Sequence, residues 1–487
     1  MRRTHRLSSS VALAACLAGA LSACTVGPNY QRPTVATPPA FKEALVPSNA
    51  PWRQAQPSDT IDRGAWWSMF NDPVLDGLER RVNISNQNVA AAAAAYAQAR
   101  DLVDQARASL FPTVSGTASA TRSSGGAGGQ VVGGFVTSGS GAQNRFAAGL
   151  TGSWDADLWG RIKRTIEADR ASAQASAADL ANARLSAQSQ LANAYYGLRI
   201  ADELKQLLSD TVTAYQRAAN LAQNRYDAGV IARADVITAQ TQLQSAQAQL
   251  VDIDVSRAQN EHAIALLVGV PPSELAIAPI KLARLVPAAP VVVPSDLLER
   301  RPDIASDERS VAAANAQIGV ATAAYFPSLT LSGSVGQSSS RLGNLFSAAT
   351  RTWSIGPTVA ETILDFGARK ARVKQAEALR DQRTAEYRQT VLTAFQQVED
   401  QLAALRVYAD EATYRDATVT SAKQAEALAL NRYQAGQVDY TTVITAQAQS
   451  LSAQQSQLTL MRQRLQSTVS LVQALGGGWT VADLPKG

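Results

Sequence analysis

The residues that most often carry soft-metal and nucleophilic chemistry are scarce in this chain. It has two Cys, at positions 16 and 24, and two His, at positions 5 and 262. A disulfide framework, a Cys/His zinc site and a His-dependent triad are therefore excluded after Cys24, because His262 alone remains. The sequence contains neither a GxxxxGK[ST] phosphate loop nor a GxSxG nucleophile elbow. We expect no enzyme activity, no metal and no dissociable cofactor.

The one cysteine in a chemically informative setting is Cys24. Arg2, Arg3 and Arg6 precede an Ala/Leu-rich run over residues 11–21, which is the pattern of a bacterial export signal and is too short to span a bilayer. The run ends in Leu-Ser-Ala-Cys24, which resembles the lipobox of bacterial lipoproteins. That resemblance implies that residues 1–23 are removed and that the Cys24 thiol carries acyl chains.

The alternatives for this segment concern which cysteine is used and where the protein goes. Leu-Ala-Ala-Cys16 also fits the lipobox pattern, but it would leave a very short apolar region. Chance cysteines in an ordinary cleaved signal are the second alternative. Thr25 stands where an Asp would resemble an inner-membrane retention signal, so we expect the outer membrane. Removal of the signal peptide removes three Arg and no acidic residue, and it lowers the net charge from +5 to +2. So small a positive charge gives no reason to expect nucleic-acid binding.

The two halves of the chain have similar sequences. Residues 224–240 recur at residues 431–447 with ten identities in seventeen positions, at an offset of 207. Earlier in each half, residues 110–114 match residues 325–329. This is an internal repeat. Together with the export signal, it divides the chain into five predicted parts: a signal peptide (1–23), an extended lipidated segment (24–80), a first repeat (81–290), a second repeat (291–475) and a tail (476–487).

Each half carries two predicted β-strands. Residues 113–121 and 146–154 alternate between hydroxyl-bearing and apolar or small side chains, and residues 329–335 and 353–363 repeat the pattern. Between the first two lies Ser123 to Gly141, where eight of nineteen residues are Gly, and we expect a long exposed loop there. A shorter loop is expected near residues 338–351.

The remainder of each half is predicted to be helical. Residues 161–226 and 369–433 contain no strong breaker except Gly197, and each would form a helix roughly 100 Å long. Phe395, Val398, Leu402, Leu405, Ala409 and Ala412 follow a heptad seam, so lateral helix partners are expected. Gly229 and Gly436 stand where each long helix must turn back into an antiparallel partner.

Four strands cannot close by themselves in a lipid bilayer. Known outer-membrane barrels begin at about eight strands, and an open edge leaves backbone groups unpaired in lipid. Several copies must then share one barrel, with about eight strands for two copies and about twelve, with room for water, for three.

Several ordered motifs identify a family. They are Gly27-Pro-Asn-Tyr-Gln-Arg-Pro33, Trp66-Trp-Ser-Met-Phe-Asn-Asp-Pro73, Arg300-Arg-Pro-Asp-Ile304, Tyr325-Phe-Pro-Ser-Leu329 and Leu475-Gly-Gly-Gly-Trp479. Together they resemble the TolC-like outer-membrane factor family, in its NodT-type, OprM-like branch of efflux lipoproteins, from Cys24 to Trp479.

The resemblance implies an α+β membrane protein that assembles as a homotrimer. Four strands and long antiparallel coiled-coil helices per chain would form a twelve-stranded β-barrel in the bacterial outer membrane, continuous with a long periplasmic α-helical barrel. The implied function is a passive exit duct of a tripartite efflux pump. Its partners would be a periplasmic adaptor, or membrane fusion protein, an inner-membrane transporter of the RND type, and outer-membrane lipid.

The same resemblance points to the helix-hairpin tips as the periplasmic gate and adaptor-docking site. Asp439 and Asp235 are the gate candidates, and Arg225, Arg432 and Arg233 are their candidate partners. The candidate docking residues are Ala228, Gly229, Val230, Ala435, Gly436 and Gln437. The competing interpretation is that both acids cap or charge-stabilise the helices that follow each turn.

A second class of protein remains open at this point. A periplasmic lipoprotein that acts as a coiled-coil spacer or adaptor without a pore would need the long helices. It would not need two strand hairpins, so the strands discriminate between the two hypotheses.

Overall fold

A computed structural model of the chain describes residues 25–43, 64–124, 130–132, 135–137, 142–282, 286–287 and 300–477. The predicted signal peptide, Cys24 and the end of the predicted tail lie outside these residues. The chain divides into two compact units. The first comprises residues 1–33, 97–175 and 308–385, and the second comprises residues 34–96, 176–307 and 386–487.

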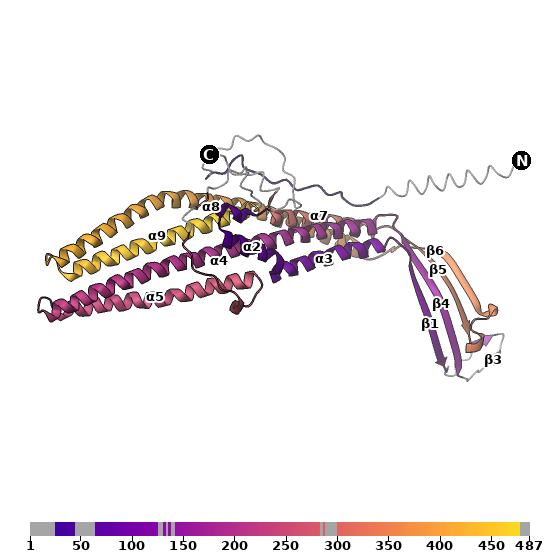
Figure 1. The fold of residues 1–487 in the computed structure, drawn as a ribbon. Coiled ribbons are helices and arrows are strands. Elements are labelled where there is room, and N and C mark those ends of the chain that lie inside the picture. The colour runs from indigo at the N-terminus through magenta and orange to yellow at the C-terminus, as the bar shows by residue number, and fades with distance from the viewer. Residues whose placement is uncertain are drawn as a thin grey trace. The chain divides into compact units, whose positions relative to one another are not determined.

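The first unit contains a four-stranded antiparallel sheet. Its strands are β1 (Thr113–Ser123), β4 (Gln143–Ala156), β5 (Ser328–Ser339) and β6 (Arg351–Ala360), in the order β1-β4-β5-β6. Two strands thus come from each half of the chain, as the sequence predicts, and the halves join where β4 pairs with β5 (Figure 1). β1 and β6 are left at the two edges of the sheet.

The large apolar side chains of this sheet are uncovered within one chain. Val114, Leu150, Trp353, Ile355 and Val359 are all exposed, and Trp353 is 74% accessible. Hydroxyl-bearing residues alternate with them along the strands. A single copy therefore offers both an uncovered apolar surface and two unpaired edges, which soluble proteins avoid.

The long loop predicted over residues 123–141 contains strand structure that the sequence analysis does not predict. β1 extends to Ser123, and a short hairpin follows from β2 (Gln130–Val132) and β3 (Phe135–Thr137), with Val131 opposite Val136. Val and Phe residues favour strand pairing, and the two glycines between them in the sequence are a hairpin-turn signal that outweighs the glycine-rich composition. Two short 3-10 helices, η3 (Leu342–Asn344) and η4 (Ala348–Thr350), occupy the second loop.

The long helices match their predicted bounds within one residue. α4 (Arg161–Asp227) and α8 (Ala368–Gln434) have 67 residues each. α5 (Arg233–Leu267) and α9 (Tyr440–Ala474) run back along them as hairpin partners (Figure 1). Gly197 does not interrupt α4. A Cβ there would lie 2.4 Å from Oδ1 of Asn260, so the close approach of α5 explains the glycine.

Shorter helices lie before the strand hairpins and after α5. α3 (Gln87–Ala108) and α7 (Pro302–Ala323) each precede a strand hairpin, and η2 (Pro272–Glu274) follows α5. The predicted heptad seam is buried at Phe395, Val398 and Leu402, whereas Ala409 is exposed. Within the described residues, no helix combines the length and the apolar character needed to cross a membrane.

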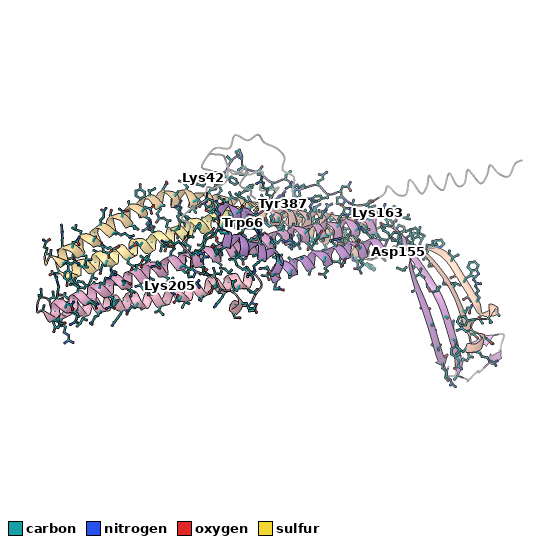
Figure 2. All side chains as sticks on the ribbon, in the orientation of Figure 1. Lys42, Trp66, Asp155, Lys163, Lys205 and Tyr387 are labelled. Atoms are coloured by element: carbon teal, nitrogen blue, oxygen red, sulfur yellow. The ribbon has the colours of Figure 1, made fainter. Side chains whose placement is uncertain are left out.

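The prediction that residues 24–80 form an extended segment is wrong for its last part. η1 (Trp66–Phe70) and α2 (Pro73–Ser85) are helical, and the predicted boundary at residue 81 falls inside α2. Asp72 caps α2, since its Oδ1 accepts from the amides of Val74 and Leu75. Trp66, marked in Figure 2, is fully buried, and its ring stands edge-on to Trp67 and Phe70 of the same helix. The ring of Phe70 also lies 5.1 Å from that of Tyr196 in α4, so a tertiary aromatic contact orders this segment.

One acid of α2 gives a test of the fold. Glu79 is 0% exposed and neither of its carboxyl oxygens has a hydrogen-bond partner. Burial, followed by the nearby charge of Asp76, raises the pKa of Glu79 well above its usual value. The folded state therefore binds this proton more tightly than the unfolded state, and stability falls as pH rises from the unfolded pKa towards the folded one.

Glu79→Gln is accordingly expected to raise the melting temperature by about 2–4 °C at pH 8 and to change little at pH 4. Thermal unfolding of the two proteins across this pH range measures it. Glu274→Gln, at an exposed acid in η2, is the control and should change neither end of the range. An equal effect of Glu79→Gln at both pH values would show that Glu79 does not titrate as argued.

Candidate functional site at the helix-hairpin tips

The two helix-hairpin tips have the same backbone design. In the first, the amide of Gly229 donates to the carbonyl of Tyr226 (2.8 Å) and the amide of Val230 donates to the carbonyl of Arg225 (2.8 Å). Gly436 and Gln437 repeat these bonds to Tyr433 and Arg432, at 3.0 and 2.9 Å. Both glycines are left-handed, with φ of 72° and 74°. A left-handed glycine ends each long helix and turns the chain back.

A buried cluster joins the two tips inside one chain. It consists of Tyr215, Ala218, Ala219, Ala222, Val236, Ala239, Leu243, Ala246, Tyr433, Tyr440 and Val443. The rings of Tyr433 and Tyr440 lie 5.2 Å apart, and burial raises the pKa of Tyr440 to about 12. All four helices α4, α5, α8 and α9 contribute, so the two hairpins are packed against each other at this end.

Arg225 makes the polar connection between the hairpins. Its Nη1 donates to the carbonyl of Tyr433 and its Nη2 to the carbonyl of Gln434, both at 2.8 Å. Its guanidinium carbon also lies 4.6 Å from the centre of the Tyr433 ring. These carbonyls end α8, where the helix dipole is negative, so a cation is favoured there. In the described chain Arg225 pairs with this helix end and not with Asp235 or Asp439.

The two gate candidates occupy different positions relative to their helices. Asp439 is the N-cap residue of α9 and is exposed, yet its side chain accepts no capping hydrogen bond. Asp235 lies in the first turn of α5, whose N-cap is Ala232, and is partly buried. The Asp439 carboxylate is therefore not engaged by its own helix and is available to groups outside the chain.

The remaining arginine candidates do not form ion pairs with these acids. Arg233 is the first residue of α5 and is exposed. Arg432 lines a groove of about 490 Å³ between α8 and α9, together with Leu428, Val438, Thr442 and Thr445. Arg225 and Arg432 are equivalent in the repeat, but only Arg225 reaches a helix end. The predicted docking residues form the two turns, and all six are exposed.

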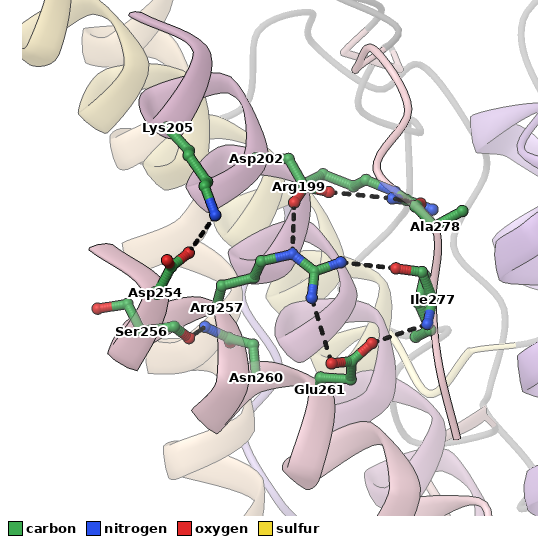
Figure 3. A network of polar contacts seen from close by, with 10 residues as sticks. All are labelled: Arg199, Asp202, Lys205, Asp254, Ser256, Arg257, Asn260, Glu261, Ile277 and Ala278. Atoms are coloured by element: carbon green, nitrogen blue, oxygen red, sulfur yellow. Dashed lines mark hydrogen bonds and ion pairs between the residues drawn. The ribbon is translucent and has the colours of Figure 1, made fainter. Parts of the chain in front are cut away.

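A second polar cluster, away from the tips, is structural. Figure 3 shows Arg257 of α5 bridging Asp202 of α4 (2.8 Å) and the carbonyl of Ile277 (2.6 Å). Glu261 accepts from the amide of Ile277 (2.7 Å), and Arg199 donates to the carbonyl of Ala278 (2.8 Å). These bonds hold the segment after α5 against both helices.

The residues that the structure describes contain no group of three His, Cys, Asp or Glu side chains arranged to hold a metal ion.

Long helical hairpins combined with a four-stranded antiparallel sheet are shared with outer-membrane channels of known structure. The chain is 31% identical to the outer-membrane channel OprN, with a TM-score of 0.83 and coverage of 94% of this chain and 100% of that one. It is 28% identical to the open state of the Neisseria gonorrhoeae MtrE outer membrane channel, with a TM-score of 0.79 and coverage of 93% and 98%.

Sequence comparison identifies the family. The profile of the outer membrane efflux protein family matches residues 80–270 and 293–477. The chain is also 31% identical to the probable efflux pump outer membrane protein TtgC of Pseudomonas putida, over 94% of this chain and 93% of that protein. It is 30% identical to the pyoverdine export outer membrane protein OpmQ of Pseudomonas aeruginosa, over 91% and 93%. The chain belongs to the outer membrane efflux protein family. It is an outer-membrane channel subunit, and the alternative of a pore-less coiled-coil lipoprotein is set aside.

Proposed function

We propose that three copies of the chain form one passive exit duct across the outer membrane. The observation that supports this best is the sheet, whose edge strands β1 and β6 are unpaired and whose Trp353, Ile355 and Val359 are uncovered. Pairing β6 of each copy with β1 of the next would satisfy the edges and would give about twelve strands, enough for a water-filled pore.

The proposed oligomer is tested by the mass of the detergent-extracted protein. We expect a particle of three chains, measured by native mass spectrometry or by the symmetry of single-particle images. The reason is that every copy has two edge strands, β1 and β6, whose outward backbone N–H and C=O groups must be paired in lipid. A stable monomer with its strands intact, or a closed dimer, would contradict the proposal.

The energy for export would come from outside this chain. We infer an inner-membrane transporter of the RND type that delivers cargo through a periplasmic adaptor, and a duct that only lets the cargo pass. Relatives of this chain are named for toluene efflux and for pyoverdine export, which are chemically very different cargoes. This variety supports a duct that leaves cargo selection to the transporter.

The tips would form the periplasmic entrance. Asp439 from three copies would stand around one axis and attract cations, with Asp235 in a secondary role. Arg225 would hold the two hairpins together, and the exposed turns at Ala228–Val230 and Ala435–Gln437 would meet the adaptor. The free Asp439 carboxylate and the carbonyl-bound Arg225 support these separate roles.

A lipid on Cys24 would anchor the mature chain. The intact mass of its amino-terminal peptide is expected to correspond to a chain that starts at Cys24 and carries acyl groups, because Leu-Ser-Ala-Cys24 resembles a lipobox. Each acyl methylene buried in the bilayer would contribute about 0.8 kcal/mol to membrane binding. Cys24→Ser should remove the added mass, whereas Cys16→Ser should not. An unmodified Cys24, or a mature chain with another start, would refute the anchor.

A further inference from the structure

The described chain begins with a segment, residues 25–30, that has no helix or strand and is nevertheless held by specific contacts. The amide of Val26 donates to the carbonyl of Trp159 at 3.2 Å. The carbonyl of Pro28 accepts from Nδ2 of Asn315 in α7 at 3.0 Å. Backbone outside regular structure requires such partners, and here they come from two segments distant in sequence.

Arg164 of α4 makes the largest share of these contacts. Its Nε donates to the carbonyl of Val26 (3.2 Å), and its Nη2 donates to the carbonyl of Gly27 (3.1 Å) and to Oδ1 of Asn29 (3.0 Å). Its Nη1 pairs with Glu167 at 2.7 Å. The side chain is 3% exposed. One planar guanidinium thus bonds to three residues of the segment, which a lysine ammonium could not match.

Glycines make the fit between these segments specific. Gly27 has a φ of 92°, and a Cβ there would lie 2.5 Å from Cα of Gly319 in α7. A Cβ on Gly319 would in turn lie 2.8 Å from Cγ of Arg164. Gly160 has a φ of 77°, and its Cβ would lie 2.6 Å from Cγ2 of Thr25. A larger residue at Gly27 or Gly160 would push the segment off its site, and a larger residue at Gly319 would displace Arg164.

The far end of the segment is fixed as well. The hydroxyl of Tyr30 donates to Oε1 of Glu308, and Glu308 is only 2% exposed. We call residues 25–30, together with Arg164, Asn315, Gly319 and Glu308, the amino-terminal seat. A buried carboxylate that receives a hydroxyl bond makes this second attachment costly to break.

The seat lies where the sheet gives way to helices. Thr25 and Val26 contact Gly160 and Trp159, in the turn between β4 and α4 whose flanking residues Asp155 and Lys163 are marked in Figure 2. Trp159 stacks on Phe326 with ring centres 4.6 Å apart. Exposed aromatic residues recur at the other strand–helix connections, namely Phe111, Tyr325 and Phe366. Aromatic side chains gather in this way at membrane–water interfaces.

We propose that the amino-terminal seat fixes the lipid-bearing end of the chain at the strand–helix junction, so that the acyl chains enter the bilayer beside these aromatic residues. This inference rests on the proposed lipidation of Cys24, the residue immediately before Thr25. Arg164 is the positioning residue, because it holds the backbone that leads to the lipid and does not touch the lipid. A lipid held at this junction would anchor the first unit, which also contains the strands of the sheet.

The seat is tested first by hydrogen exchange in the purified full-length protein. In Arg164→Ala the amide of Val26 should exchange at least about tenfold faster, because three bonds from a charged donor to the segment are lost. Arg164→Lys should fall between this variant and the wild type. Arg170→Ala, at an exposed arginine of the same helix, should leave the rate unchanged. Wild-type exchange in Arg164→Ala would overturn the seat.

A depth measurement separates positioning from a general loss of stability. In a Gln31→Cys variant, a bimane label reports on the exposed end of the segment in vesicles that contain headgroup-nitroxide lipid. Quenching should be strong, should fall at least twofold with Arg164→Ala, and should persist with Arg170→Ala, in trimers of equal heat resistance. Equal quenching in all three would refute the positioning role.

The failure of the anchor itself is distinguishable from the failure of the seat. The only native cysteines are at 16 and 24, so a mature chain that starts at Cys24 and carries Gln31→Cys takes up one label if Cys24 is acylated and two if it is not. Two labels would refute the lipid and, with it, the positioning of a lipid. Slow exchange of Val26 would then still establish the contacts of the segment.

Discussion

Arg225→Ala is expected to raise the mean conductance of the isolated channel. The two bonds that Arg225 donates to the end of α8 are each worth about 1.5–3 kcal/mol as hydrogen bonds to a charged group. Their loss removes the polar connection between the two hairpins of one chain. If the closed tip depends on that connection, the open fraction should increase by at least about tenfold. Recordings in planar bilayers at fixed salt measure this change directly.

The repeat supplies a matched control for this experiment. Arg432 is the equivalent residue of the second half, but it lines the groove between α8 and α9 and makes no bond to a helix end. Arg432→Ala should leave the conductance of the isolated channel unchanged, and Arg225→Lys should be intermediate. A lower melting temperature without any change of conductance in Arg225→Ala would show that this arginine only stabilises the fold.

Asp439→Ala is expected to weaken the cation preference of the channel. Three carboxylates near one axis would raise the local cation concentration, and their repulsion would be offset by the ions and water that they attract. The reversal potential in a salt gradient should therefore move towards zero, most clearly at low ionic strength. Thermal stability should not change, because the Asp439 side chain accepts no capping bond. A cap would instead cost about 1 kcal/mol on removal.

Asp235→Ala is the comparison at the tip of the first repeat. Asp235 lies in the first turn of α5 and is less exposed, so a smaller effect on selectivity is expected. If both single variants and the double variant keep the wild-type conductance and ion preference, the acidic gate is wrong. The constriction would then lie among other residues of the two hairpins, such as Tyr440 or Thr442.

Most of the fold could be predicted from local sequence patterns. Residues 113–270 and 358–484 contain no proline, which allows the long helices α4 and α8, and Gly229 and Gly436 mark the ends of these helices. Alternating side chains indicated the four long strands. The helices η1 and α2 were missed because burial of Trp66 and its aromatic neighbours orders them, and this depends on helices far along the chain.

The site was less predictable than the fold. The sequence located the two tips, since a strong repeat and a left-handed glycine are local signals. It could not separate Arg225 from Arg432, because both stand in the same Asn-Arg-Tyr motif. The two differ in their contacts with the other hairpin, where Arg225 finds the carbonyl groups that end α8. Nor could it show that Tyr433 is both the acceptor and the ring partner of Arg225.

Single-channel recording of the purified, detergent-extracted protein tests the central claim most directly. A shared pore made by three chains predicts discrete conductance steps with cation preference, one step for each inserted particle, and larger steps or longer openings in Arg225→Ala. Folded trimers that insert into the bilayer and conduct no ions, in the wild type and in both Arg225→Ala and Asp439→Ala, would contradict a channel.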